Sequence, residues 1–413
     1  MNTFRTALLV LLGLTVTTAA YAHQDHAHDD HADHAEHHDH GDHATDAGDH
    51  ADHGDAHGDD HATTDGAFDP TPMIMHHIAD ANEFHVWGDF SIPLPVIMFD
   101  ATAGKLDVMM SSAFDHGHTE HAGYVLDHGR VKLAHNVEVL ERIHHLEDEL
   151  AAADDEAASA LEAEISTLEK SVHDVYDLSI TKNVFTMLLT AAIMLLVFLS
   201  VAKAYRTRTG QAPRGLQGFL EPLILFIRDE VAQPNLGHKS DKFLPYLLTI
   251  FFFIWINNLL GLIPIFPGSA NVTGNIAVTF SLAFLTLLVT NVSANKDYWQ
   301  HIFWMPGVPV PVRLLLMPIE LIGVLTKPFA LMIRLFANIT AGHIIVLSLV
   351  SLIFVFGNAG TNPGGAAAGA AIAIPFTLFI SLIELLVAFI QAFIFTMLSA
   401  VFIGLAIEEH EHH

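Results

Sequence analysis

The chain has 413 residues, of which 51% are hydrophobic; it carries a formal net charge of −28 and contains no cysteine. Residues 23–182 contain 6 Lys and Arg against 36 Asp and Glu, whereas residues 183–413 contain 11 against 10, and 24 of the 30 histidines precede residue 183. The acidic half would repel phosphate and the apolar half lacks a basic patch, which excludes nucleic-acid binding. The lack of cysteine excludes disulfides, thiol catalysis and Cys-ligated metal clusters.

Residues 1–22 are predicted to be a secretory signal peptide. Arg5 gives a positive start, residues 7–16 form a short apolar run, and Ala20-Tyr21-Ala22 has the small-x-small pattern of a cleavage site. An uncleaved membrane anchor is the alternative. In both cases, the region that follows is expected to be exported.

Residues 23–66 form an acidic tail with 13 histidines between residues 23 and 61 and almost no large apolar side chain. Such a segment cannot bury enough surface to fold, so it is predicted to be disordered. Alternating imidazole and carboxylate groups suit loose binding of Zn²⁺, Ni²⁺ or Cu²⁺ without a fixed spacing that would define one site. The alternative is a solvated linker whose histidines charge below about pH 6.5. The candidate metal ligands are His26, His28, His31, His34, His37, His38 and His40.

Residues 67–135 and 136–181 are expected to form a small exported α+β module and an amphipathic helical spacer. The β-rich runs 84–87, 94–99 and 124–126 are separated by Gly and Pro. After residue 137, apolar side chains recur at helical spacing among Glu and Ala. They include Leu146, Leu150, Leu161, Ile165, Leu168 and Val172.

Residues 182–413 are predicted to be an all-α membrane domain with five to six membrane-embedded helices. Uninterrupted apolar runs predict membrane helices at 184–202, 244–263 and 276–292. Residues 215–231 alternate apolar and charged side chains with helical spacing, which predicts a helix lying in the membrane interface.

Two further apolar segments, 314–356 and 373–407, are longer than a membrane requires. At about 1.5 Å per residue the first would be about 65 Å long, twice a bilayer core. We therefore expect it to be steeply tilted or bent at Pro318 and Pro328.

The basic residues predict the orientation in a bacterial inner membrane. Loop 203–243 carries seven Lys and Arg and loop 294–313 carries two, whereas 265–274 and 357–372 carry none. The positive-inside rule puts the basic loops and the C-terminus in the cytoplasm. The region before residue 183 is then outside, in agreement with the signal peptide.

The two long segments contain ionisable residues, which are costly in a membrane and mark ion or proton paths. Glu320, Lys327 and Arg334 are seven residues apart and share a helix face, which Asn338 adjoins, whereas His343 is about half a turn from Arg334. A second shared face is formed by Glu384 and Gln391.

Arg334 cannot relay a proton, because a guanidinium does not lose one at accessible pH. It can act as a fixed positive charge that attracts a mobile carboxylate, with a snorkelling or structurally paired arginine as the alternative. His343 and Glu384 are able to take up and release protons. Each alone would be read as a packing residue, but together with Arg334 they favour a proton path.

Other function classes fit less well. The sequence has no Gly-x-x-x-x-Gly-Lys-Ser/Thr loop, so nucleotide chemistry would belong to another chain. A metal transporter would need clusters of His, Asp and Glu in its membrane helices, where His343 and Glu384 are the candidates and Arg334 would repel a cation. A tethered periplasmic binding module would leave the polar membrane residues unexplained.

The run Thr326–His343 reads TKPFALMIRLFANITAGH, and it resembles the signature of the a subunit of F-type ATP synthases. Gln391–Phe395 (QAFIF) resembles the last-helix motif of that family, and Asn257–Pro264 (NNLLGLIP) resembles an earlier loop. The resemblance covers roughly residues 180–410. Residues 23–181 lie outside it, although His76–Asp80 is similar to part of the exported N-terminus of some bacterial members.

The resemblance implies a role for each polar residue. Arg334 would be the essential stator charge facing the carboxylates of a rotating c-ring, and Glu320 would lie on the cytoplasmic path. The exported-side half-channel would be lined or supported by Asn338, His343, Glu384 and Gln391. The best-known members have an acid at the position of His343 and a histidine at the position of Glu384. The exchanged order seen in this chain is also found in the family.

The resemblance also implies the partners and the reaction. The c-ring, b-type peripheral-stalk subunits, other membrane-sector subunits and membrane lipid would contact this chain. It would have no cofactor and no catalytic site of its own, and would serve as a subunit of a proton-transporting ATP synthase. Whether the coupled ion is H⁺ or Na⁺ stays open.

Overall fold

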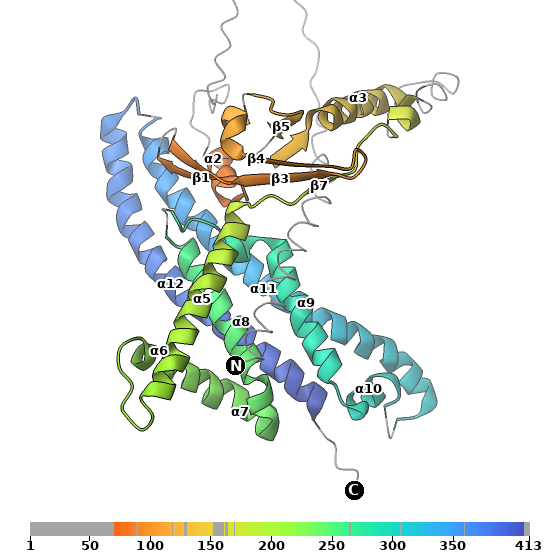
Figure 1. Ribbon diagram of the computed structural model, residues 1–413, viewed down its shortest axis with the longest axis vertical. Coiled ribbons are helices and arrows are strands. Elements are labelled where there is room, and N and C mark those ends of the chain that lie inside the picture. The colour runs from red at the N-terminus through yellow and green to blue at the C-terminus, as the bar shows by residue number, and fades with distance from the viewer. Residues whose placement is uncertain are drawn as a thin grey trace, which may run out of the picture.

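The computed structural model describes residues 70–408, with gaps at 88–89, 118, 128–129, 152–160, 162–163, 169, 264–265, 306–307 and 359. The signal peptide predicted at 1–22 and the His-rich tail predicted at 23–66, with its candidate metal ligands, lie outside the described residues. The described chain forms a small module, residues 70–180, that sits at one end of a helical bundle, residues 182–408 (Figure 1).

The module is an α+β unit of short antiparallel strands, as predicted. Its sheets have the orders β1-β2, β4-β3-β7 and β5-β6. The β-rich runs that the sequence indicates become β1, β3 and β5. The elements are α2 (Thr71–Ile78), β1 (Glu83–Trp87), β2 (Phe90–Pro93), β3 (Pro95–Asp100), β4 (Lys105–Met110), η1 (Ser111–Gly117), β5 (Tyr124–Asp127), β6 (Arg130–Leu133), α3 (Ala134–Ala151) and β7 (Val175–Asp177).

Strand β3 organises the module core because it alternates inward and outward side chains. Val96 and Met98 point inward and pack on Phe114, Tyr124 and Val131. The Tyr124 hydroxyl donates a hydrogen bond to Asp107 at 3.2 Å, and burial raises the pKa of this tyrosine to about 12. This small core therefore joins the β4-β3-β7 sheet to the β5-β6 sheet, whereas Phe84 of β1 packs in the core of the bundle.

The segment 136–181, which its pattern assigns to a helical spacer, is built into the module. Val139, Ile143 and Leu146 of α3 pack on Ile165, which lies in a second helical stretch, 164–168. The chain then adds β7 to the edge of β3 by antiparallel pairing. Strand pairing over such a separation leaves no local periodicity, so the sequence pattern does not reveal it.

The bundle contains five helical segments that are long and apolar enough to span a membrane, among the described residues. This bears out the predicted all-α membrane fold. The elements are α5 (Lys182–Thr207), α6 (Leu216–Phe226), η2 (Ile227–Ala232), α7 (Gln233–Leu236), η3 (Gly237–Lys239), α8 (Ser240–Gly261), η4 (Val272–Gly274), α9 (Ile276–Ser293), α10 (Lys296–Phe303), α11 (Val310–Phe356) and α12 (Pro363–Ile407).

Helix α8 lies at the centre of the bundle, against α5, α12 and η2. Phe251, Phe252 and Phe253 are all buried, although consecutive residues point in different directions. A helix buried on all sides needs apolar residues all round, which explains why α8 has no amphipathic pattern. At the end opposite the module, α6 and α7 lie across the bundle (Figure 1), where the sequence predicts an interfacial helix.

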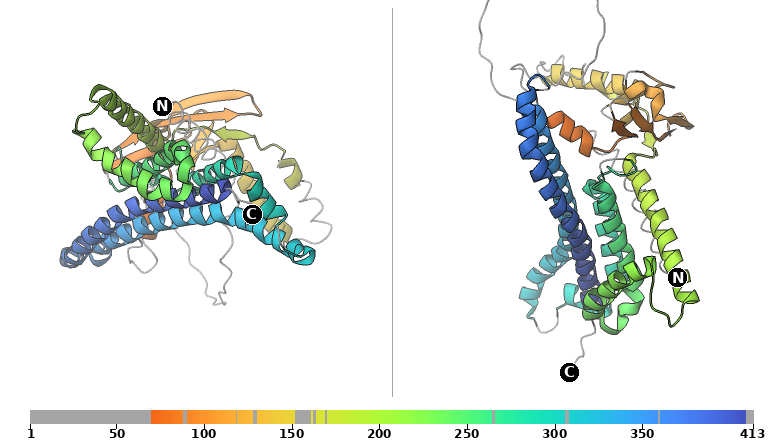
Figure 2. Two further views of the ribbon diagram at one scale, coloured as in Figure 1. Left: turned by 90° about the horizontal axis from the view of Figure 1, so that it is seen from below. Right: turned by 90° about the vertical axis from the view of Figure 1, so that its left-hand side faces the viewer.

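Helices α11 and α12 have 47 and 45 residues, so each is about 70 Å long. Figure 2 shows them side by side and curved, leaning across the other helices. Pro318 and Pro328 lie within α11 without ending it. This length in a bilayer core of about 30 Å requires a steep tilt, as predicted.

Two boundaries differ from the sequence expectation. Helix α12 begins at Pro363 and not near 373, because its Gly- and Ala-rich first turns pack closely on α11. A Cβ at Gly369 would be only 3.0 Å from the carbonyl oxygen of Leu352. Helix α10 occupies part of 294–313, which was expected to be a loop. Its eight residues are too few to stand out from their flanks.

An ion pair fastens the edge of the module sheet. The Nδ1 of His173, just before β7, is 2.8 Å from the carboxylate of Asp100 at the end of β3. Asn136 hydrogen-bonds both the backbone N–H and the C=O of His173, at 2.9 Å each. The hydrogen bond from His173 lowers the pKa of Asp100, against the opposing effect of burial. Together these contacts hold β7 against β3.

We expect Asp100→Asn to loosen this edge at neutral pH, because the variant loses the charged hydrogen bond. The stabilisation from a lowered carboxyl pKa is complete above its ordinary value of 3.8 and is lost as the pH falls through the lowered value. Hydrogen exchange of β3 and β7 amides in the intact protein, corrected for its intrinsic pH dependence, measures the effect. The variant should exchange faster at neutral pH, and the difference should vanish in acid. Equal exchange at neutral pH would contradict the prediction.

Candidate functional site

Arg334 lies near the middle of α11, on a side of the helix that the rest of the chain leaves uncovered. Its side chain and that of Asn338, one turn further on, are exposed. Their neighbours Phe329 and Ile333 are exposed apolar side chains. In the described part of the chain, no group hydrogen-bonds or ion-pairs with the guanidinium. A permanent charge therefore stands on an apolar helical surface.

Glu384 of α12 reaches α11 at Gly342, the residue before His343. A Cβ added at Gly342 would overlap the carboxylate of Glu384, so this glycine makes room for the acid. The Nε2 of His343 points to the end of α8, 3.7 Å from the position of a Cβ at Gly261. Glu384 of α12 and His343 of α11 thus lie at one level of the bundle, on the module side of Arg334.

A lysine and an aspartate that the sequence analysis did not single out lie near this pair. The charge of Lys182, the first residue of α5, acts on the His343 imidazole. The carboxylate of Asp80, in the module, acts in turn on Lys182. Asp80 and Lys182 are far apart in the chain, and no local spacing pattern links them. Lys182 therefore lies at the junction of the module and the bundle, near His343.

Buried amides and hydroxyls join α8 to its neighbours below His343. Asn258 donates to the carbonyl of Ala388 in α12 at 3.3 Å and accepts from Thr273 at 2.5 Å. Gln391, one turn beyond Ala388, is only 7% exposed and lies on the same helix as Glu384. The sequence contains a signal for this layer, the adjacent pair Asn257 and Asn258 inside an apolar span. Burying two amide side chains in a membrane helix costs free energy unless both form hydrogen bonds.

Asn257, the other member of the asparagine pair, accepts a hydrogen bond from Thr190 of α5 at 3.1 Å. Its own amide donates to the carbonyl of Phe253 at 2.8 Å. Polar contacts thus connect α5, α8 and α12 about one helix turn below the level of His343 and Glu384.

Glu320 lies on the other side of Arg334. The two residues are fourteen positions apart on α11, about 21 Å along the helix axis. Burial raises the pKa of Tyr298 in α10, and the charge of Glu320 raises it further. Glu320 and Tyr298 are therefore close, at the end of the bundle opposite the module.

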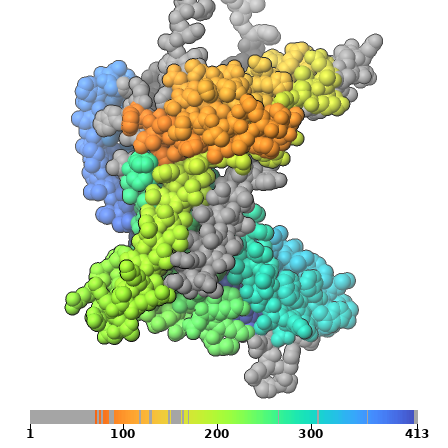
Figure 3. Space-filling model, in the orientation of Figure 1, coloured from red at the N-terminus to blue at the C-terminus, as the bar shows by residue number. Residues whose placement is uncertain are grey.

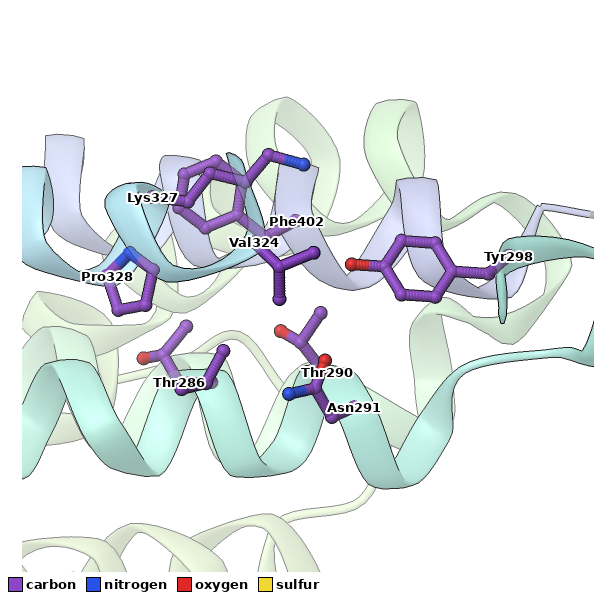
Figure 4. Close-up of a pocket in the computed structure, with 9 residues that line it drawn as sticks. Thr286, Thr290, Asn291, Tyr298, Val324, Lys327, Pro328 and Phe402 are labelled. Carbon is purple, nitrogen blue, oxygen red and sulfur yellow. The ribbon is translucent and has the colours of Figure 1, made fainter. Parts of the chain in front are cut away.

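A small polar cavity adjoins Tyr298, between α9, α10, α11 and α12 (Figure 4). The Tyr298 and Thr290 hydroxyls point into it, and the ammonium group of Lys327 lies 5.8 Å from the ring centre of Phe402. Among the described residues, nothing hydrogen-bonds the buried Oγ1 of Thr290 or Oδ1 of Asn291. The cavity has room for about one water molecule. Its lining is Thr286, Leu287, Thr290, Asn291, Tyr298, Val324, Lys327, Pro328 and Phe402.

The structure thus separates the predicted site residues into three places. His343 and Glu384 lie toward the module, and Glu320 lies at the opposite end of the bundle. Between them, Arg334 and Asn338 lie on the uncovered face of α11. Gln391 lies on α12 at about the level of Arg334, because α12 runs antiparallel to α11 between the contacts Gly342–Glu384 and Lys327–Phe402. Within the described ranges, no three His, Asp or Glu side chains are grouped as a metal site would require.

Comparison with known proteins identifies the bundle. Residues 184–404 match the family described as ATP synthase A chain, which is more than half of the chain. Residues 73–157, in the module, match a domain of unknown function, DUF8433. The chain is similar to ATP synthase subunit a of Chloroherpeton thalassium, with 47% identity over 241 residues, 57% of this chain and 69% of the relative.

Two further relatives give the same result. Subunit a 2 of Chlorobaculum tepidum is 48% identical over 245 residues, 58% of this chain and 66% of the relative. Subunit a 2 of Prosthecochloris aestuarii is 46% identical over 244 residues, 58% and 71% of the two chains. The matched region contains the helices that carry Arg334, His343 and Glu384. The resemblance seen in the sequence is confirmed: the chain belongs to the ATP synthase A chain family.

Proposed function

We propose that this chain carries protons across the membrane in the membrane sector of an F-type ATP synthase, along two offset paths that both end at Arg334. The observation that carries the proposal is the position of Arg334, exposed on an apolar helix between two polar regions. His343 is nine residues from it on one side, about 13 Å along the axis, and Glu320 is about 21 Å away on the other. Neither polar region reaches past the arginine.

The exposed arginine calls for a partner from another subunit. A charge left in lipid costs several kcal/mol, and a guanidinium cannot escape this cost by losing its proton. Only 6% of the most apolar part of α11 is buried within the chain, against 61% of the segment that contains α8. An apolar helical ring that carries carboxylates would cover α11 and neutralise Arg334. We identify this partner as the c-ring.

Proton transfer would then proceed in two steps. A proton enters on the module side, passes His343 and Glu384, and neutralises a c-ring carboxylate. The neutral carboxyl group can turn through lipid at a far lower cost than the ionised form. After almost a full turn the proton leaves toward Glu320, and Arg334 attracts the carboxylate that results.

Arg334 also prevents a short circuit. Water that connected the two paths directly would let protons cross without rotation of the ring. A fixed positive charge at the meeting point repels a proton that approaches from either side. The cavity beside Tyr298 supports the release path, since its unpaired Thr290 and Asn291 oxygens are suited to hold water near Glu320.

The orientation follows from the charged loops. The end that carries α6, α7 and α10 is basic, and the positive-inside rule puts it in the cytoplasm. The module then faces the exported side. A membrane potential supplies about 2.3 kcal/mol per charge per 100 mV, so several protons are needed for each ATP. We assign the nucleotide chemistry to other subunits, and contacts with b-type stalk subunits to the remaining bundle surface.

Arg334→Ala should abolish coupling while the complex still assembles. We expect proton-driven ATP synthesis in sealed vesicles to fall about a hundredfold or more, because the fixed charge is lost from an apolar site. Ile333→Ala is the matched control, since it shortens an adjacent exposed apolar side chain and leaves the charge in place. Normal proton-driven synthesis by Arg334→Ala would refute the proposed function.

Gly342→Ala should impair proton transport without unfolding the bundle. The new methyl group would displace the Glu384 carboxylate, which is the mobile end of a side chain, whereas alanine itself favours a helix by about 1 kcal/mol. Gly323→Ala on the same helix is the control, because a Cβ there meets nothing within 4 Å. We expect slower proton uptake in reconstituted complexes for the first variant alone. Equal rates for both variants would argue against a role for the Glu384 position.

A further inference from the structure

The module is joined to the bundle through the first turn of α5. The backbone N–H of Lys182 donates to the carbonyl of Ala81 at 2.9 Å. The N–H of Asn183 donates to the Asp80 carboxylate at 3.2 Å. Figure 3 shows the module seated on this end of α5. The loop after α2 and the start of a membrane helix therefore form one hydrogen-bonded unit.

Buried polar atoms without partners gather at this joint. They are both side-chain polar atoms of Asn82, Oδ1 of Asn183 and Oγ1 of Thr186, and none has a hydrogen-bond partner among the described residues. The three residues are 2%, 3% and 0% exposed. We call Asn82, Asn183 and Thr186 the junction cluster. Buried polar atoms that lack a hydrogen bond destabilise a protein, and ordered water is the usual partner that satisfies them.

Two members of the junction cluster, Asn183 and Thr186, lie in the first turns of α5 with Lys182, whose charge acts on His343. Lys182 is itself 8% exposed, and the Asp80 carboxylate, which accepts the Asn183 N–H, acts on it. The unpaired atoms of the junction cluster thus point to water beside this buried charge, next to the module-side path.

An aromatic contact closes the joint toward the apolar side. Phe84 of β1 is buried and packs edge-on against Phe185 of α5, with ring centres 5.5 Å apart, and against Phe266 at 5.3 Å. Phe185 points away from the cluster into the apolar core, as expected for a residue next to Thr186 on a helix. The module therefore supplies both an apolar seal and polar atoms at the mouth of the path.

We propose that the junction cluster is hydrated and forms the outer part of the proton uptake path, so that the module is a wall of this path. The inference rests on the proposed function, in which protons reach the c-ring past His343. Water held by Asn82, Asn183 and Thr186 would deliver protons beside Lys182, and Asp80 would hold the ammonium group in position. The module then determines how the uptake path opens to the exported side.

The natural lack of cysteine makes a direct test possible. Thr186→Cys and Asn183→Cys would be made in the intact complex, in a background whose other subunits contain no reactive cysteine. Silver ion added from the module side of sealed vesicles reacts with thiols that water reaches. The matched control is Met187→Cys, because Met187 is next to Thr186, is also 0% exposed, and packs in the apolar core.

We expect silver to block proton-driven ATP synthesis at least about tenfold faster in Thr186→Cys and Asn183→Cys than in Met187→Cys. A tenfold ratio corresponds to a difference of about 1.4 kcal/mol in the free energy of silver access to the thiol. Equal rates at all three positions, or no reaction at the two cluster positions, would overturn the proposal. The result is separate from the Arg334 test. If Arg334→Ala is inactive and Thr186→Cys does not react with silver, the proposal of a hydrated junction cluster fails, whereas the proposed function stands.

A second measurement uses variants that keep the shape of the side chain. Thr186→Val removes one water-binding oxygen and should slow proton uptake about fivefold, the effect of about one lost hydrogen bond. Thr186→Ser keeps the hydroxyl and should restore most of the rate. A purely structural role predicts the opposite order, because valine fills the space better than serine.

Discussion

A guanidinium that keeps its proton in an apolar membrane surface is the constraint on which the rest of this molecule depends. Arg334 cannot be neutralised, and the described chain gives it no partner. The charge is tolerable only if a carboxylate from outside the chain can approach it, and that requires an uncovered helix face. The exposure of α11 is thus a requirement of the charge. A protein that buried α11 in its own core would leave the arginine without access to a partner.

Close helix packing is the second requirement, because protons must reach the arginine face without a wide water channel. Glycines make this possible where α11 meets its neighbours. Gly342 admits the Glu384 carboxylate, and Gly369 lets α12 begin against α11. At each of these positions, the lack of a side chain allows the two helices to lie close together. The acid and the histidine come from different helices, and only this close approach puts them at one level.

Sequence reasoning was most effective where the solvent alone decides the structure. An uninterrupted apolar run must span the membrane, so the predicted span 184–202 lies within α5 and the span 276–292 within α9. It was least effective where structure depends on distant partners. Strand β7 exists because β3 offers it an edge, and the first turns of α12 exist because α11 packs on their glycines. No local pattern carries that information.

The same division holds for the site. Arg334, Glu320 and Glu384 stand out in the sequence because charge in an apolar run is rare, whatever the fold. Lys182 and Asp80 do not stand out, since both lie in polar surroundings along the chain. Lys182 becomes buried beside Asp80 only when the module docks on α5, and it then lies near His343.

The module therefore cannot be regarded as a purely structural part that is separate from transport in the bundle. Asp80 and Ala81 hydrogen-bond the first turn of α5, and that turn carries the charge that acts on His343. A rearrangement of the module would move Lys182 and change the field at the histidine. In the proposed orientation the module faces the exported side, so conditions there would act on proton uptake through this one turn of helix. The large negative charge of the N-terminal half would then concentrate cations, protons included, at the mouth of the path.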